Sequence, residues 1–185
     1  MLNRLLALIL LIGISPLLLI ISFFIFIDDG FPILFTQKRV GKDYTFFKMY
    51  KFRSMKKNTP NVATHLLKNP EQYVLKAGKI IRKLSFDELP NFINILKGDM
   101  VFVGPRPALY NQDKLMALRV KHGIEKLKPG LTGWAQINGR DEISNEEKVT
   151  LEVEYLNKKS VRLDVSIFFK TFTSAFFGKN KGVTH

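Results

Sequence analysis

The pattern of hydrophobic and polar positions divides the chain into an apolar N-terminal segment and a mixed, basic body. The segment from Leu5 to Ile27 contains 23 consecutive residues without a charge. At about 1.5 Å per residue, such a helix covers the roughly 30 Å hydrocarbon core of a bilayer. Phe23 to Phe26 offers no small-residue cleavage site, so the pattern predicts a retained membrane helix rather than a signal peptide.

The midpoint of this segment, Ser15-Pro16, predicts a kink. Proline removes a backbone donor, and the serine hydroxyl can satisfy the carbonyl that is freed. Two arrangements are open: a kinked helix that spans the bilayer, or a re-entrant helix-break-helix that enters and leaves on one face. Arg4 before the segment and Lys38 and Arg39 after it favour a cytoplasmic body in either case.

Within the body, the periodicity predicts an α+β fold that is mainly helical with a small sheet. Aromatic residues between Tyr44 and Phe52 partly alternate and predict a strand, and Met100 to Val103 resembles another. Helices are expected over Glu71 to Lys83, Phe92 to Leu96, Asn111 to His122 and Ser144 to Asn157, and a loop over Asn58 to Asn61. Ser144 with Glu147 forms a capping box, which explains Glu147 structurally.

A C-terminal stripe of large apolar residues recurs at helical spacing: Val165, Phe168, Phe169, Phe172 and Phe176. With lysines nearby, the stripe is typical of an amphipathic helix at a membrane interface. A buried core helix explains it equally well, because apolar residues at this spacing are first a packing signal. Both interpretations remain open.

Length and charge limit the organisation and the partners of the chain. The 185 residues predict an anchor at 1–30 and one domain at 31–185 that carries any chemistry. The net charge of +13 favours an anionic partner, whether phospholipid headgroups, nucleic acid or a phosphorylated substrate. Because the chain has no cysteine, disulfides, thiolate nucleophiles and cysteine-bound zinc are excluded.

Two adjacent carboxylates, Asp87 and Glu88, stand out in this basic chain. Ser85 and Glu88 also match a capping box, which would make the pair the start of a helix without chemistry. Pro90 indicates that the next helix begins near Asp87, because an interior proline loses a backbone hydrogen bond. The pair is therefore expected at or near the first helical turn.

These residue types suit chemistry on phosphates. An aspartate such as Asp87 can attack a phosphoanhydride and form an aspartyl phosphate, and Glu88 can bind a hard cation such as Mg²⁺. Arg106 stands between two prolines, and this stiff backbone suits a preorganised phosphate ligand. No metal cluster follows from the scattered histidines, His65, His122 and His185.

Other familiar machinery is missing: no GxxxxGK[ST], GxGxxG, HExxH or GxSxG motif occurs. Gly130 to Gly133 matches the GxxG loop of one RNA-binding module. Together with the basic stretch from Thr36 to Lys57, it keeps open a membrane-tethered nucleic-acid-binding protein as an alternative. A Mg²⁺-dependent phosphohydrolase is the nearest enzymatic alternative, and it differs in using water as the acceptor.

Six motifs occur together along most of the chain: Phe35 to Gly41 (FTQKRVG), Lys51 to Met55 (KFRSM), Leu84 to Pro90 (LSFDELP), Leu96 to Met100 (LKGDM), Val103 to Pro107 (VGPRP) and Lys128 to Arg140 (KPGLTGWAQINGR). In this combination the chain resembles the bacterial sugar transferase family, the monotopic phosphoglycosyl transferases. Its short length resembles their minimal catalytic form. It is most similar to members that transfer phospho-diacetylbacillosamine to undecaprenyl phosphate in protein N-glycosylation.

The resemblance implies a reaction and roles for particular residues. Asp87 would attack the β-phosphate of a UDP-sugar donor, expel UMP and hold the phosphosugar until polyprenyl (undecaprenyl) phosphate accepts it. Glu88 would help to bind Mg²⁺. Arg106, with Arg82 and Arg53, would hold phosphate oxygens. No nucleic-acid partner is implied, and the sugar and the oligomeric state stay open.

The resemblance also bears on the anchor and on three further positions. The Ser15-Pro16 break implies a re-entrant hairpin on the cytoplasmic face of the bacterial inner membrane, with anionic phospholipid as a partner. Asp164 matches a recurring family aspartate and joins the candidate substrate-binding residues, although no role for it can be derived. Asn91 and Lys128 replace the usual glutamine and arginine and keep the polar character.

Overall fold

The computed structural model describes residues 1–60, 69–139 and 143–177. His65, His185 and the side chains of Phe172 and Phe176 lie outside the described residues, so interpretations that involve them stay predictions. Over the described ranges the chain is mainly helical with two small sheets, which confirms the predicted fold class.

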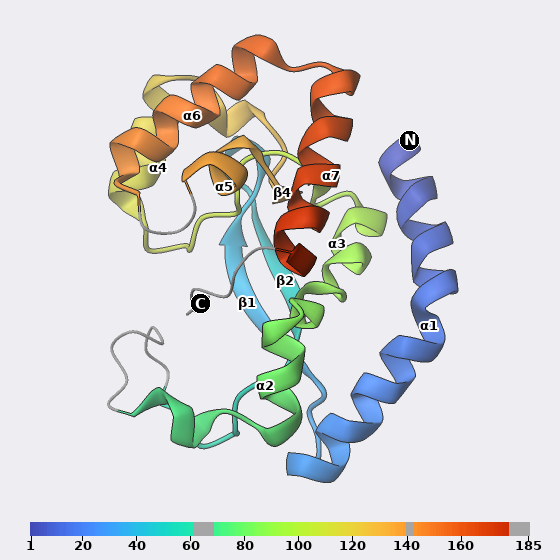
Figure 1. The fold of residues 1–185 in the computed structure, drawn as a ribbon. Coiled ribbons are helices and arrows are strands. Elements are labelled where there is room, and N and C mark those ends of the chain that lie inside the picture. Colours follow the sequence, from blue (N-terminus) through green and yellow to red (C-terminus); the bar gives the residue numbers. More distant parts are fainter. Residues whose placement is uncertain (61–68, 140–142, 178–185) are drawn as a thin grey trace.

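The apolar N-terminal segment forms one long helix, α1 (Leu2–Asp29), with Pro16 in its interior. The helix bends about midway along its length (Figure 1). Proline at position 16 cannot donate to the carbonyl of Ile12, and the Ser15 hydroxyl donates to that carbonyl instead at 2.8 Å. Among the described residues, α1 is the one helix long and apolar enough to cross a membrane.

A β-hairpin follows the helix and presents two distinct faces. Strands β1 (Leu34–Val40) and β2 (Phe46–Phe52) pair antiparallel, with Arg39 opposite Phe47 and Phe35 opposite Lys51. Directly opposed residues share a face, and every second residue of a strand does so too. Arg39 and Lys51 therefore lie on the same face. The alternation predicted β2, whereas β1 was not expected.

The helical elements after the N-terminal helix are η1 (Lys42–Tyr44), η3 (Pro70–Tyr73), α2 (Lys76–Lys83), η4 (Phe86–Glu88), α3 (Asn91–Lys97), α4 (Asp113–Lys121), η5 (Ile124–Lys126), α5 (Trp134–Gly139), α6 (Asn145–Lys158) and α7 (Val161–Phe177). The helix predicted over 71–83 is shorter, because Val74 bridges to Met55 in an extended conformation and regular helix starts only after Leu75. The predicted capping box of α6 is confirmed.

A second, parallel pair of strands crosses the middle of the molecule. It joins β3 (Val101–Val103) to β4 (Gly130–Thr132). The interpretation of Gly130 to Gly133 as an exposed nucleic-acid-binding loop is wrong, because Gly130 and Thr132 are buried in β4. A Cβ on Gly130 would lie 2.1 Å from the backbone nitrogen of Gly104, so these glycines permit close packing of two backbones.

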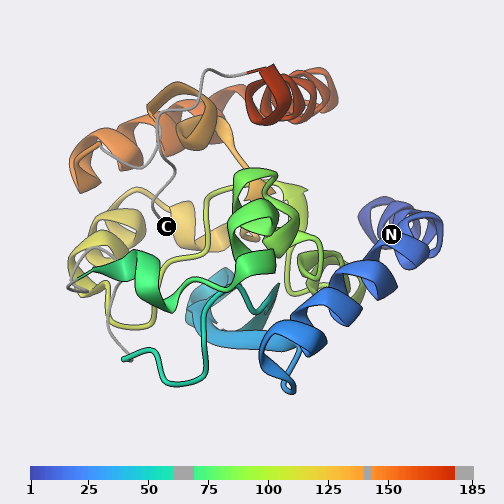
Figure 2. The ribbon, with the colours of Figure 1, turned by 60° about the horizontal axis from the view of Figure 1, so that its bottom comes forward.

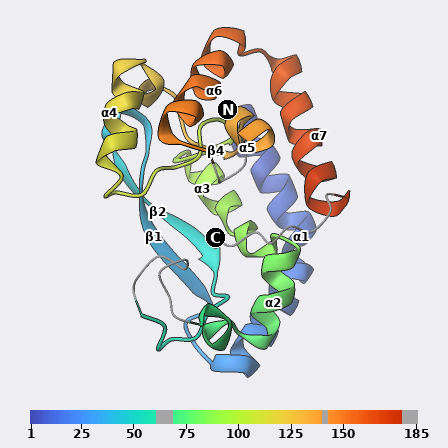
Figure 3. The ribbon, with the colours of Figure 1, turned by 60° about the vertical axis from the view of Figure 1, so that its left-hand side comes forward.

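Helix α1 belongs to the core along much of its length. Ala7 is fully buried in one cluster with Ile95 of α3 and Ile167 of α7. Ile21 and Ile25 are buried in a second cluster beside α2. Helix α3 lies between α1 and the hairpin (Figure 3). The outer residues of α1 remain exposed and almost entirely apolar.

Helix α7 has both a packed and an exposed apolar face. Ile167 is fully buried, and Phe168 stacks edge-on against Phe102 at a centroid distance of 5.9 Å. Val165 and Phe169 are exposed. The core and the interfacial interpretation of the stripe therefore each describe one face. Helices α6 and α7 lie across the molecule from the β1–β2 hairpin (Figure 2).

Candidate active site

The carboxylate pair lies in a tight turn between two helices. Asp87 and Glu88 belong to η4, and α3 begins only after Pro90. Ser85 adopts a left-handed conformation (φ 56°) and makes no capping hydrogen bond with its side chain. The capping-box interpretation of Ser85 and Glu88 is therefore wrong, and the pair precedes the regular helix instead of starting it.

A lysine joins the two carboxylates. Lys51 Nζ, from β2, lies 2.8 Å from Glu88 Oε1 and 3.7 Å from Asp87 Oδ2. Asp87 is only 8% exposed, and this burial raises the pKa of its carboxyl, while the charges of Lys51 and Arg82 oppose the rise. Asp87 is thus a poorly hydrated carboxylate whose negative charge is held by neighbouring cations.

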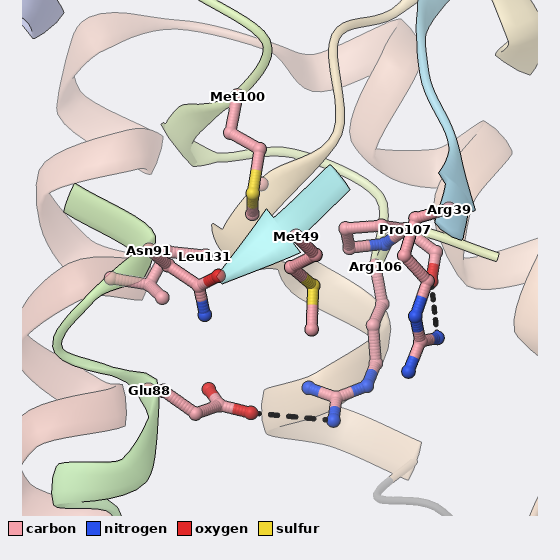
Figure 4. Close-up of a pocket in the computed structure, with 9 residues that line it drawn as sticks. Arg39, Met49, Glu88, Asn91, Met100, Arg106, Pro107 and Leu131 are labelled. Carbon is pink, nitrogen blue, oxygen red and sulfur yellow. Dashed lines mark hydrogen bonds and ion pairs between the residues drawn. The ribbon is translucent and has the colours of Figure 1, made fainter. Parts of the chain in front are cut away.

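A pocket opens beside Glu88 and is lined by cationic and polar side chains. It encloses about 230 Å³, partly open to solvent, and its walls include Arg39, Asn91 and Arg106. Arg106 Nη2 lies 3.5 Å from Glu88 Oε1, and the Arg39 and Arg106 guanidinium groups project side by side (Figure 4). Asn91 Oδ1 is buried without a hydrogen-bond partner among the described residues.

Arg39 is fixed in this pocket by its own hydrogen bonds. Its Nη1 donates to the carbonyl of Pro107 at 2.9 Å, and its Nη2 donates to Gln37 Oε1 at 2.6 Å. Burial and the charge of Arg106 lower the pKa of Arg39 to about 10, so the group keeps its charge at neutral pH. Two guanidinium groups against one glutamate leave the pocket positive, as an anion site requires.

Comparison with known proteins identifies the family. The family model described as bacterial sugar transferase matches residues 1–178. The chain belongs to the bacterial sugar transferase family. It is 39% identical over 182 residues to the UDP-glucose:undecaprenyl-phosphate glucose-1-phosphate transferase of Escherichia coli (strain K12), covering 94% of this chain and 39% of that protein.

Two further relatives of this chain come from other bacteria. It is 37% identical over 171 residues to the UDP-N-acetylgalactosamine-undecaprenyl-phosphate N-acetylgalactosaminephosphotransferase of Aeromonas hydrophila, covering 89% of this chain and 40% of that protein. It is 44% identical over 143 residues to the uncharacterized sugar transferase EpsL of Bacillus subtilis (strain 168), covering 77% and 69%. The chain therefore spans about two fifths of the length of the first two relatives.

The predicted site residues separate into two groups. Glu88 and Arg106 line the pocket, Asp87 is linked to Glu88 through Lys51, and Arg82 influences Asp87 electrostatically. Arg53 lies instead at the end of α1, where its Nη2 donates to the carbonyl of Gly30 at 2.6 Å.

Asp164 also lies away from the pocket lining. Its Oδ1 accepts a hydrogen bond of 2.7 Å from the hydroxyl of Tyr155. Burial and this hydrogen bond raise the pKa of Tyr155. The contact gives Asp164 a structural partner between α6 and α7, and its predicted part in substrate binding stays a prediction.

Sequence reasoning did not place Lys51 and Arg39 at the candidate site. Both belong to motifs that carry the family resemblance, but neither was assigned a role, because a charge run usually marks a solvated surface. The signal that could have found them is the alternation of β2, which puts Lys51 on the same face as Met49. Arg39 could not be placed without the pairing of β1 with β2.

Proposed function

We propose that this chain transfers a sugar phosphate from a UDP-sugar to polyprenyl phosphate and releases UMP. The observation that carries the proposal is the buried Asp87 carboxylate, joined to Glu88 by Lys51 at the edge of a pocket lined with guanidinium groups. Membership of the bacterial sugar transferase family supports the same reaction class. The named relatives supply undecaprenyl phosphate as the expected acceptor.

In the first step, an oxygen of Asp87 attacks the β-phosphorus of the UDP-sugar. A bond forms between that oxygen and phosphorus, and the bond from the β-phosphorus to the bridging oxygen breaks, so that UMP leaves with both bonding electrons. Arg39 and Arg106 bind the phosphate oxygens and reduce their repulsion of the carboxylate. Burial makes Asp87 a stronger nucleophile than a hydrated carboxylate.

In the second step, a phosphate oxygen of the polyprenyl phosphate attacks the same phosphorus. The bond from phosphorus to Asp87 breaks, the carboxylate is regenerated, and a polyprenyl diphosphate sugar is formed. Lys51 stabilises the carboxylate at the start and at the end of the cycle, because its ammonium group contacts both acidic residues. The two displacements give ping-pong kinetics.

Magnesium is a proposed cofactor of this reaction. Mg²⁺ is commonly held by one or two carboxylates together with substrate phosphates, and Glu88 with Asp87 provides such a donor set. No group of three acidic or histidine ligands occurs among the described residues, so the diphosphate would complete the coordination. Glu88 would help to hold the ion, and the ion would supply charge neutralisation for the phosphates.

Release of UMP by the detergent-solubilised protein tests the proposal. The assay contains Mg²⁺, undecaprenyl phosphate and a panel of UDP-sugars, including UDP-diacetylbacillosamine, UDP-glucose and UDP-N-acetylgalactosamine. We expect UMP and a lipid-linked phosphosugar with one donor, and a loss of at least about 10³-fold in Asp87→Asn. Asp113→Asn, an exposed site on α4 with the same change of charge, should retain activity. Turnover that persists in purified Asp87→Asn would contradict the covalent mechanism.

The acceptor separates this proposal from its enzymatic alternative. A Mg²⁺-dependent phosphohydrolase would release sugar phosphate and UMP without polyprenyl phosphate, because water would take the group. UMP release that depends on the lipid therefore supports the transferase, and lipid-independent hydrolysis supports the alternative. The nucleic-acid-binding alternative relied on a GxxG loop at Gly130 to Gly133. Gly130–Thr132 form strand β4 instead, and Gly130 and Thr132 are buried.

We propose further that α1 enters and leaves the inner membrane on its cytoplasmic face. Both ends of the helix bond to the same body: Arg4 donates to the carbonyl of Lys97, and Asp28 accepts from the backbone of Ala77. A helix that crossed the bilayer would carry one end away from the body. The exposed apolar side of α1 would face the lipid, and the basic surface would bind anionic headgroups.

Site-directed labelling tests this topology, since the chain has no cysteine. Single cysteines at Leu2 and at Lys48 are treated with an impermeant maleimide in inside-out and right-side-out vesicles. Both side chains are exposed in the folded protein. We expect both to react only in inside-out vesicles. Labelling of the Leu2 position from the opposite side would show that α1 spans the bilayer.

A further inference from the structure

The loop that carries Arg106 is held almost entirely through its carbonyl groups. Its two prolines have no N–H to donate. Four successive carbonyls, those of residues 105–108, accept in turn from Gly130 N, Arg119 Nη2, Arg39 Nη1 and Val40 N, each at 2.9 Å. The loop is thus attached to three different elements, β4, α4 and β1. Two of these donors are side chains. Arg39 lines the pocket, whereas Arg119, which donates to the carbonyl of Arg106, does not.

That side chain, Arg119, belongs to a buried ion pair. Arg119 of α4 is 5% exposed and Glu152 of α6 is 2% exposed. Arg119 Nε donates to Glu152 Oε2 at 2.8 Å, and Nη2 contacts the other carboxylate oxygen while it also donates to the Arg106 carbonyl. Neither residue lines the pocket beside Glu88. They lie on the other side of the loop, where Arg119 and Pro105 line a second small cavity.

Stability alone is a weak reason for such a pair. Removing two charges from water costs several kcal/mol per ion, and well-packed apolar residues of similar size often replace a buried pair without loss of stability. A function that depends on geometry explains the pair better. The guanidinium of Arg119 bridges the carboxylate of α6 and the backbone of the residue whose side chain contacts Glu88.

We propose that Arg119 and Glu152 are positioning residues that fix Arg106 for binding of the donor's phosphates. The inference rests on the proposed role of Arg106 as a phosphate ligand. Glu152 neutralises and orients Arg119, and Arg119 holds the carbonyl of Arg106. Without this hydrogen bond, the Arg106 carbonyl loses its partner, and the backbone of residue 106 can shift between the neighbouring attachments of Pro105 and Pro107. A displacement of about 1 Å is enough to cost a large part of a preorganised contact.

The test removes both charges at once, so that no buried charge is left without its partner. The variant Arg119→Met with Glu152→Leu should unfold within a few degrees of the parent protein, because both replacements are apolar and of similar length. We expect its Michaelis constant for the UDP-sugar to rise about tenfold, with a smaller change in kcat. The exposed pair Lys79 and Glu71, changed to Met and Leu, is the control and should alter neither quantity.

A double-mutant cycle with Arg106→Ala shows whether the pair acts through Arg106. We expect the pair variant to have little further effect on donor affinity once Arg106 is alanine. If the combined variant loses donor affinity by the product of the two separate losses, the inference is overturned, because the pair would then contribute independently of Arg106. An unchanged Michaelis constant in the folded pair variant would overturn it as well.

Calorimetric titration with UDP separates failure of this inference from failure of the proposed function. If the parent protein binds UDP but releases no UMP, the transferase proposal is wrong. The double-mutant cycle is then evaluated on the affinity for UDP alone. If Arg106→Ala leaves UDP affinity unchanged, both the phosphate role of Arg106 and the positioning role of Arg119 are wrong. If Arg106→Ala weakens binding and the pair variant does not, only the positioning role is wrong.

Discussion

At the scale of single residues, the site holds a carboxylate that is shielded from the water that would normally hydrate its charge. Asp87 is buried, and its charge is stabilised by Lys51 and by the guanidinium group of Arg82. Because burial raises its pKa, the ionised form costs stability in the folded state at neutral pH. The nucleophile is therefore maintained at the expense of stability.

Asp87→Asn is expected to stabilise the protein at neutral pH while it abolishes turnover. The folded-state pKa lies above the unfolded value of 3.8, so the penalty is fully present above the folded pKa and absent below 3.8. Thermal unfolding in EDTA should show a higher midpoint temperature for Asp87→Asn than for the parent protein near pH 7. The gain should shrink as the pH falls. A loss of stability at neutral pH would contradict this account of the burial.

Lys51→Met should reduce UMP release by about tenfold or more, because the ammonium group that holds both carboxylates is lost. Removing this cation should also raise the pKa of Asp87 further, so the acid limb of the pH–rate profile should move to higher pH. Lys48→Met is the control, since Lys48 lies on the opposite face of the same strand. Equal effects of the two substitutions would mean that the loss is not specific to the site.

At the scale of elements, a residue of the apolar N-terminal helix caps another helix. Asp28 of α1 accepts a hydrogen bond of 3.0 Å from the backbone N–H of Ala77 in the first turn of α2. Asp28→Ala should lower the free energy of unfolding by about 1 kcal/mol, the usual loss for a missing cap. Denaturant unfolding in detergent measures it. Asp28→Asn keeps an acceptor oxygen and should therefore retain most of the free energy of unfolding that Asp28→Ala loses. If the contact were purely electrostatic, the uncharged asparagine would not retain it.

Local patterns predicted most elements whose signals lie within a few residues. The capping box at Ser144 and the alternation in β2 are examples, and both are confirmed. Strand β1 was missed because Lys38 and Arg39 interrupt its apolar character, and only its pairing with β2 defines it. Strand β4 was missed because two of its neighbours are glycine and proline, which usually indicate a turn.

The candidate site was predictable where the motif is local. The turn that carries Asp87 and Glu88 follows from one short motif, and Arg106 follows from another. In the structure, Arg106 Nη2 lies 3.5 Å from Glu88 Oε1. Lys51 and Arg39 depend on strand pairing, which spacing alone does not give. Arg119 is still harder to predict from the sequence, because its contact with Arg106 requires the relative placement of α4, α6 and the loop.

At the scale of the whole molecule, the N-terminal helix and the body build two hydrophobic clusters together. Ala7, Ile21 and Ile25 are buried among residues of the body. Deletion of residues 1–29 should therefore yield an aggregated or unfolded protein rather than a soluble domain. Size-exclusion chromatography and near-UV circular dichroism of the truncated protein test this. A monomeric fragment with native-like near-UV signals would show that the body folds without α1.

The contact between Asn3 and Phe102 has a consequence for the order in which the protein matures. The Asn3 side chain accepts from the backbone of Phe102, a residue 99 positions later in the chain. The first helix leaves the ribosome long before this partner has been made. The face of α1 that later packs against the body therefore has no protein partner until those residues have been made. Under the membrane location proposed above, lipid is the cover expected for this face during that interval.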